Sequence, residues 1–270
     1  MDEAVQEKAA DDAPREGAPA RGEAPAIERF LLIIGAMKSG TTTLFEYLAQ
    51  HPEIARSLRK EPNLFGKPGT TRKTREARYP RLWPGFDPAR HRYAMEASTH
   101  YTKAPRHARA PAVISRLPQE TRLLYIVRDP VERIESQLAH NIAQGRIGHD
   151  VSWDHPALRQ AIDVSRYAHQ LARYAKAMPD REILVLDFEE LKRDPLAVTR
   201  RCVGFLGIDP GFAFSPIPPA NVRRSAHAGD RFSLSDELRA RLRAELAPDA
   251  RRFARRHGFD ISAWGLGTKA

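Results

Sequence analysis

The stretch FLLIIGAMKSGTTT, residues 30–43, decides the fold. Its first five residues form a continuous apolar run, which is typical of a strand buried on both faces of a parallel sheet. A glycine-containing loop follows, and beyond it Leu44, Phe45 and Leu48 recur at helical spacing. A loop between a buried strand and a helix directs backbone N–H groups at an anion, so residues 35–43 predict a phosphate-binding loop.

The alternation of strand and helix continues along the chain. Apolar runs at 123–127 and 183–186 predict two more buried strands, and a helix is expected after each, at 131–143 and 195–206. Strands that alternate with helices indicate an α/β fold with a mostly parallel central sheet flanked by helices. We therefore expect a single α/β domain with a P-loop-like core over residues 27–270, a length that suits one such domain.

Further expectations concern the remaining segments. Residues 164–177 predict one helix, and residues 235–257 predict a helix that is broken at Pro248. The Pro- and Arg-rich stretch 66–92 is expected to be a long excursion that faces substrate rather than core. Residues 1–26 are acidic and rich in Ala and Pro, with almost no large apolar side chain, so we expect a disordered tail.

Composition limits the class of protein. The net charge is +10, and the 26 N-terminal residues carry three basic and seven acidic side chains, which leaves about +14 on the rest. A body this basic favours anionic partners, although a solvated basic surface is the plain alternative. No apolar stretch approaches the roughly 18 residues of a membrane span, and no signal-peptide pattern is present. We expect a cytoplasmic protein in which Cys202, the single cysteine, is a core residue.

The phosphate loop differs from that of ATP-dependent kinases. Gly35 and Gly40 have the glycine spacing of G-x-x-x-x-G-K-[ST], but Thr41 stands where the lysine belongs. Lys38 lies two residues before the second glycine instead, which moves the cation relative to bound phosphates and argues against a Mg²⁺-dependent kinase. The order Lys-Ser-Gly-Thr-Thr resembles the 5′-phosphosulfate loop of sulfotransferases that use PAPS (3′-phosphoadenosine-5′-phosphosulfate). The resemblance implies that the phosphosulfate is held by Lys38, Ser39, Gly40, Thr41, Thr42 and Thr43.

A second motif agrees with the first. Residues 125–136, YIVRDPVERIES, resemble the family's 3′-phosphate segment, in which an arginine ends a strand and a serine lies eight residues on. The resemblance implies that Arg128 and Ser136 contact the 3′-phosphate, and a forked guanidinium suits that anion. The alternative is an ion pair between Arg128 and Asp129. The likeness covers about residues 27–264 and is closer to carbohydrate (heparan-type) sulfotransferases than to those acting on phenols and steroids.

The same resemblance names an acid–base group. Residues 59–65, RKEPNLF, resemble the family's Lys-Glu-Pro-x-x-Phe stretch, whose glutamate is the general base, so Glu61 is the candidate base. The alternative is a surface pair of Lys60 and Glu61. Histidine is the base in the phenol and steroid branch, which makes His100 and His140 reserve candidates. Lys38 is a catalytic candidate, because its cation would stabilise the charge that grows as the sulfuryl group departs.

Two positions leave alternatives open. Family members often have a lysine after the glutamate that matches Glu96, whereas this chain has Ala97, so a cation is missing or is supplied by Lys60 or Lys103. A late basic loop covers the nucleotide in the family, and of the two segments that qualify, 221–224 and 229–231, we favour the second, with Arg231 as the contact.

The resemblance implies transfer of the sulfuryl group of PAPS to a hydroxyl or amine, with PAP (3′,5′-phosphoadenosine) as product and no metal. A glycan, a lipid-linked sugar or a small metabolite would each fit as acceptor, and the oligomeric state is not readable. The main alternative is an ATP-dependent small-molecule kinase with a variant P-loop. A nucleic-acid-binding module would explain the charge, but we find no such motif, and a catalytically inactive scaffold of the same family is a further alternative.

Overall fold

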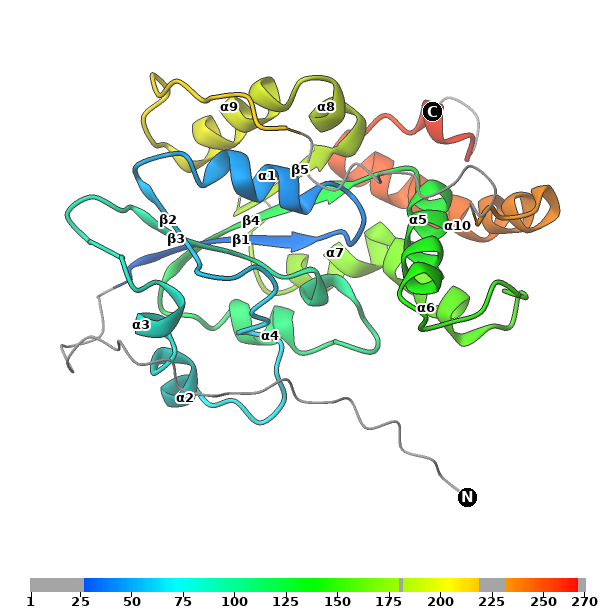
Figure 1. The fold of residues 1–270 in the computed structure, drawn as a ribbon, viewed down its shortest axis with the longest axis horizontal. Coiled ribbons are helices and arrows are strands. Elements are labelled where there is room, and N and C mark those ends of the chain that lie inside the picture. The colour runs from blue at the N-terminus through cyan, green and yellow to red at the C-terminus, as the bar shows by residue number, and fades with distance from the viewer. Residues whose placement is uncertain (1–26, 180–181, 219–231, 267–270) are drawn as a thin grey trace.

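The centre of the molecule is a parallel β-sheet with helices on both faces (Figure 1). The computed structural model describes residues 27–179, 182–218 and 232–266. Five strands run in the order β2-β3-β1-β4-β5, and every neighbouring pair is parallel. They are β1 (Arg29–Gly35), β2 (Ile54–Arg56), β3 (Tyr93–Ala97), β4 (Glu120–Val127) and β5 (Ile183–Asp187). The expected α/β class is therefore confirmed.

Side chains of the central strand β1 alternate between two hydrophobic cores. Phe30, Leu32 and Ile34 lie in one core and Leu31 and Ile33 in the other, and all five are fully buried. This is the arrangement that a continuous apolar run produces, because successive side chains of a strand point to opposite faces.

Three groups of helices cover these cores. One face of the sheet carries α1 (Thr41–Leu48), α8 (Phe188–Arg193) and α9 (Pro195–Leu206). The other face carries α3 (Tyr79–Leu82), α4 (Ala110–Ile114), α7 (Tyr167–Ala175) and the second half of α10 (Asp236–His257). A third, smaller core joins the first half of α10 to α5 (Pro130–Ala143) and α6 (Pro156–Ser165). The remaining short helices are α2 (Arg72–Glu76), η1 (Thr99–Thr102) and η3 (Ser262–Trp264).

Two helix predictions need correction. Residues 164–165 end α6 and residues 167–175 form α7, because Arg166 leaves the helical conformation between them. The buried carboxylate of Asp249 then accepts the backbone N–H groups of Ala168 and His169, which fixes the new helix start. Helix α10 is continuous through Pro248. Its side chains are buried in the core on both sides of the proline, and this packing offsets the lost backbone hydrogen bond.

The segment 66–92 is only partly an excursion. Helix α2 has no buried residue, but Tyr79, Leu82 and Trp83 are buried in the core beneath the sheet. The Trp83 indole packs against Phe30 with ring centroids 5.6 Å apart and donates its N–H to the Met95 carbonyl at 3.0 Å. Residues 79–83 therefore contribute to the core, contrary to the prediction, whereas residues 84–92 are exposed or half-buried.

The remaining predictions concern Cys202, membrane-spanning helices and two segments outside the described residues. Cys202 is fully buried in the core between the sheet and α9, as expected. Among the residues that the structure describes, no helix is both long and apolar enough to cross a membrane. The expected tail, residues 1–26, and the expected nucleotide contact Arg231 lie outside the described residues.

Candidate active site

The phosphate loop joins β1 to α1. Its last residue, Gly40, adopts φ 81° and precedes α1, so no side chain caps the first turn of that helix. A Cβ at Gly40 would lie 3.0 Å from the side chains of Phe188 and Leu191, which adds a steric reason for glycine to the conformational one. Thr41, Thr42 and Thr43 form the uncapped first turn, whose N–H groups are available to an anion.

Two buried polar atoms at this loop fit an anionic ligand. Ser39 is fully buried, and its Oγ has no hydrogen-bond partner in the described part of the chain. Nε of Arg128 is also buried and has no hydrogen-bond partner in the described part of the chain. Buried polar atoms in proteins are nearly always hydrogen-bonded, so both are suited to contacts with bound phosphate oxygens.

Arg128 and Ser136 lie on the neighbouring strand–helix connection. Asp129 caps α5 by accepting the N–H groups of Val131 at 2.8 Å and Glu132 at 3.1 Å. The Arg128 guanidinium lies 5.0 Å from the ring centroid of Phe188 and 3.4 Å from the Glu132 carboxylate. Ser136 is half-buried in the second turn of α5. Arg128 therefore pairs with Glu132, and the alternative pair with Asp129 does not form, because Asp129 serves as the helix cap.

The sheet brings these two connections together. Strands β1 and β4 are adjacent and parallel, and the Ala36 N–H donates to the Ile126 carbonyl at 2.8 Å. Their carboxyl ends therefore meet at one edge, where the strand order changes direction. Open α/β sheets bind ligands at this position.

Glu61 follows β2 in a segment that lies against the end of β3. Its backbone N–H donates to the Ala97 carbonyl at 2.8 Å, and its carboxylate accepts the Thr99 N–H at 2.9 Å and lies 3.0 Å from Lys60 Nζ. Burial raises the pKa of Glu61, but the attraction of His100, Lys60 and the Thr99 N–H outweighs burial and lowers this pKa to about 2. Glu61 is thus held ionised.

The reserve histidines differ in position. His100 Nδ1 lies 3.7 Å from the Glu61 carboxylate, and its ring contacts that of His107. His140 lies in the last turn of α5. The structure therefore brings His100 into direct proximity with Glu61.

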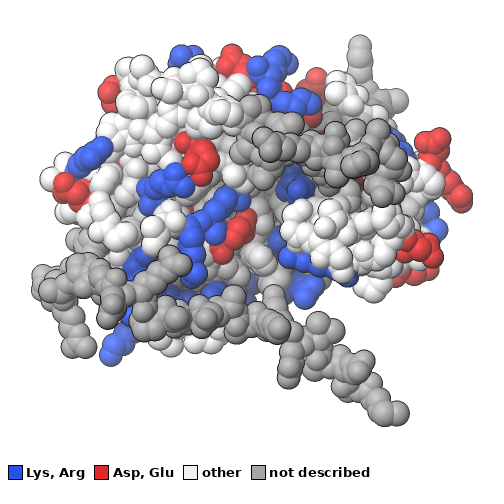
Figure 2. All heavy atoms as spheres, in the orientation of Figure 1, with Lys and Arg blue, Asp and Glu red and all other residues white. Residues whose placement is uncertain are grey.

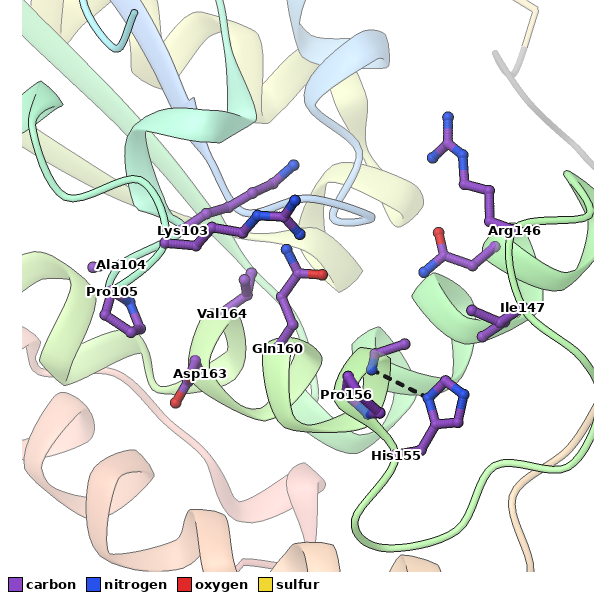
Figure 3. Close-up of a pocket in the computed structure, with 13 residues that line it drawn as sticks. Lys103, Ala104, Pro105, Arg146, Ile147, His155, Pro156, Gln160, Asp163 and Val164 are labelled. Atoms are coloured by element: carbon purple, nitrogen blue, oxygen red, sulfur yellow. Dashed lines mark hydrogen bonds between the residues drawn. The ribbon is translucent and has the colours of Figure 1, made fainter. Parts of the chain in front are cut away.

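Lys103 is a buried cation that interacts with Glu61. It is 9% exposed, and burial lowers its pKa to about 8 against the opposing attraction of Glu61. It lines a cleft of about 730 Å³, together with Arg106, Asn141, Arg146 and Gln160. Figure 3 shows Lys103 on one wall, Arg146 across the cleft and Gln160 between them. Basic side chains, with acidic ones among them, gather near the middle of the face in Figure 2.

Arg133 is a site residue that sequence reasoning missed. It is fully buried below the phosphate loop and donates to the Met37 carbonyl at 3.3 Å. Its other acceptors are Ser165 Oγ at 2.7 Å, Gln137 Oε1 at 2.7 Å and the Ala161 carbonyl at 2.8 Å. None of these acceptors is charged, so the cation adds to the positive potential at the loop. The helical spacing of the sequence gave no signal that separates it from a surface arginine.

Comparison with known proteins decides the family. The model of the sulfotransferase family matches residues 31–212, which include the phosphate loop, Glu61 and the Arg128 segment. The chain belongs to the sulfotransferase family. A bacterial sulfotransferase from Alicyclobacillus acidocaldarius has a solved structure that is similar with a TM-score of 0.70 and 27% identity, covering 87% of this chain and 98% of that one.

Curated relatives of this sulfotransferase carry the names of heparan sulfate sulfotransferases. Mouse heparan sulfate glucosamine 3-O-sulfotransferase 3A1 is 30% identical over 66% of this chain and 45% of its own length. Mouse bifunctional heparan sulfate N-deacetylase/N-sulfotransferase 4 is 24% identical over 68% of this chain and 23% of its own length. The sulfotransferase therefore spans less than half the length of these curated relatives.

Proposed function

We propose that this sulfotransferase transfers the sulfuryl group of PAPS to a hydroxyl or amine of a carbohydrate acceptor. One observation carries the proposal. The loop that ends in Gly40 and the Arg128 connection lie at the ends of adjacent strands, each with a buried polar atom suited to an anion. A nucleotide with anionic groups at both its 5′ and 3′ positions matches such a pair of sites, and ATP has no 3′-phosphate.

The residues suit an in-line transfer. The acceptor oxygen or nitrogen forms a bond to sulfur, the bond from sulfur to the bridging oxygen of PAPS breaks, and PAP leaves with that oxygen. Glu61 would take the acceptor proton, since its carboxylate is ionised and partly exposed. Lys38 would stabilise the charge that develops on the departing oxygen.

The cleft beside Lys103 is the proposed acceptor site. Lys103 links the cleft to Glu61, because it lines the cleft and is attracted by the Glu61 carboxylate. The walls of the cleft combine guanidinium and amide groups that can bind sugar hydroxyl and anionic groups (Figure 3). The names of the heparan sulfate relatives support a glycan. We also propose that Lys103 supplies the cation that Ala97 lacks, because Ala97 is buried in the core while Lys103 lines the cleft and is attracted by Glu61.

Calorimetry with PAP in the presence of excess chelator tests the nucleotide assignment. We expect PAP to bind without metal, and ATP to bind far more weakly under the same conditions. The phosphate loop lacks the Gly-Lys-Ser/Thr order that surrounds Mg²⁺ in kinases. Binding of ATP that requires Mg²⁺, with no binding of PAP, would reject the proposal and restore the kinase alternative.

A further inference from the structure

Glu96 is a fully buried acid that the proposed chemistry does not use. It lies near the carboxyl end of β3, and it forms no salt bridge among the residues that the structure describes. Burying a carboxylate without a paired cation costs several kcal/mol unless hydrogen bonds replace water. A role in packing alone would be served as well by an apolar side chain, so the contacts of this carboxylate need an explanation.

The carboxylate of Glu96 accepts two hydroxyl hydrogen bonds. Ser98 Oγ donates to Oε2 at 2.7 Å, and the Tyr101 hydroxyl donates to Oε1. Each hydroxyl oxygen in turn accepts a backbone N–H from the segment that carries Glu61. Asn63 N–H donates to Ser98 Oγ at 2.9 Å, and Phe65 N–H donates to the Tyr101 hydroxyl at 3.1 Å.

The segment 61–65 needs these contacts because its backbone is strained. Glu61 and Asn63 adopt φ 57° and 51°, which L residues with side chains rarely occupy. Such conformations persist only where the surroundings fix them. The N–H groups of every second residue fix the segment here. Glu61 N–H donates to the Ala97 carbonyl, and the N–H groups of Asn63 and Phe65 donate to the hydroxyl oxygens of Ser98 and Tyr101, respectively.

We propose that Glu96 is a positioning residue for Glu61. As a carboxylate it only accepts, so both hydroxyl hydrogens must point at it, and the oxygen lone pairs must then face the two backbone N–H groups. This single arrangement fixes the strained segment and with it the direction of the Glu61 carboxylate. The catalytic part of this inference rests on the proposed function, whereas the structural part does not.

The charges around Glu96 set the pH range in which it is a carboxylate. Burial raises the pKa of Glu96 to about 7, against the lowering effect of the hydrogen bonds from Tyr101 and Ser98. Glu61 raises this pKa further by repulsion, and Lys60 lowers it by attraction. The protonation of Glu96 therefore depends on the charges of Glu61 and Lys60.

The test compares backbone amide exchange in four variants by NMR. Glu96→Gln replaces an acceptor by a donor and should speed exchange at both Asn63 and Phe65, by about 5- to 10-fold. Ser98→Ala should speed exchange mainly at Asn63, and Tyr101→Phe mainly at Phe65. The matched control is Tyr93→Phe, which removes a buried hydroxyl from the other end of β3 and should change neither amide. The two hydroxyl variants keep the test decisive if Glu96→Gln does not fold.

The catalytic arm uses a double-mutant cycle with Glu61→Gln. Glu96→Gln alone should lower single-turnover rate by about 10- to 100-fold with unchanged PAP affinity, since small misplacements of a catalytic group have such effects. In the Glu61→Gln background it should cause no further loss. Unchanged exchange at Asn63 and Phe65, or a full loss in both backgrounds, would overturn the inference. If the wild type transfers no sulfuryl group, the proposed function fails, and the exchange pattern alone supports or overturns the positioning role.

Discussion

Replacing Glu61 by glutamine removes the proposed base while preserving its shape. The amide oxygen can still accept the Thr99 N–H, but the amide cannot take the proton of the acceptor. A general base contributes about 10²–10⁴-fold to rate. The pKa of Glu61 is about 2, so the carboxylate is a weak base and the loss should fall near the lower end, at about 10²-fold. This loss corresponds to about 2.7 kcal/mol in the activation barrier.

The same pKa fixes the pH dependence of the effect. Because Glu61 loses its proton near pH 2, it is ionised throughout the range in which the folded protein is assayed. Titration of Glu61 itself should therefore leave the ratio of wild-type to Glu61→Gln turnover unchanged between pH 5 and pH 8, whereas protonation of Glu96 should lower this ratio below about pH 7. An acid limb near neutral pH that persists in Glu96→Gln and vanishes when Glu61→Gln is added would show that the pKa of the base is much higher than the surroundings of Glu61 imply.

The assay is single-turnover sulfuryl transfer at saturating PAPS, with PAP affinity measured in parallel. Glu46→Gln is the matched control, because Glu46 is also 35% exposed at its side chain and also pairs with a cation, Arg56. We expect wild-type turnover from this control and wild-type PAP affinity from both variants. Wild-type turnover in Glu61→Gln would refute the assignment and move the base to His100, which lies beside it.

Three other substitutions test the remaining cations. Arg128→Ala should weaken PAP binding in calorimetry by about 10-fold or more relative to the same nucleotide without the 3′-phosphate, and an equal loss for both nucleotides would reject the contact. Lys38→Ala should lower turnover at saturating PAPS more than it lowers nucleotide affinity, and unchanged turnover would exclude its catalytic role. Wild-type activity should fall as pH rises through about 8, where Lys103 loses its proton, and Lys103→Arg should move this limb to higher pH. An alkaline fall in activity at the same pH in Lys103→Arg would show that Lys103 does not supply the required cation.

The sequence predicted the elements with a continuous apolar run or a clear helical spacing. Strands β1, β4 and β5 and helices α5 and α9 were found in this way, although β5, at the edge of the sheet, is mostly half-buried and not the buried strand that was expected. Strands β2 and β3 were missed, since β2 has three residues and the acid Glu96 interrupts the apolar run of β3. Helix α10 continues through Pro248 because tertiary packing outweighs local propensity.

The site was predictable where it lies in contiguous motifs. The phosphate loop and Arg128 are each followed by a helix, and the adjacency of parallel strands brings them together. The support of Glu61 was not predictable, because Thr99 and the Ser98 and Tyr101 hydroxyls reach it only through tertiary contacts. The cytoplasmic location stays a prediction.

Mass spectrometry of an acceptor panel incubated with the protein and PAPS tests the central claim most directly. The panel would contain glucosamine-containing oligosaccharides, other glycans and small hydroxyl or amine compounds. We predict the gain of one sulfuryl group on a carbohydrate acceptor, with matching formation of PAP and a strong reduction in Glu61→Gln. A gain of phosphate from ATP on a member of the panel, with no sulfuryl gain from PAPS on any member, would contradict the account.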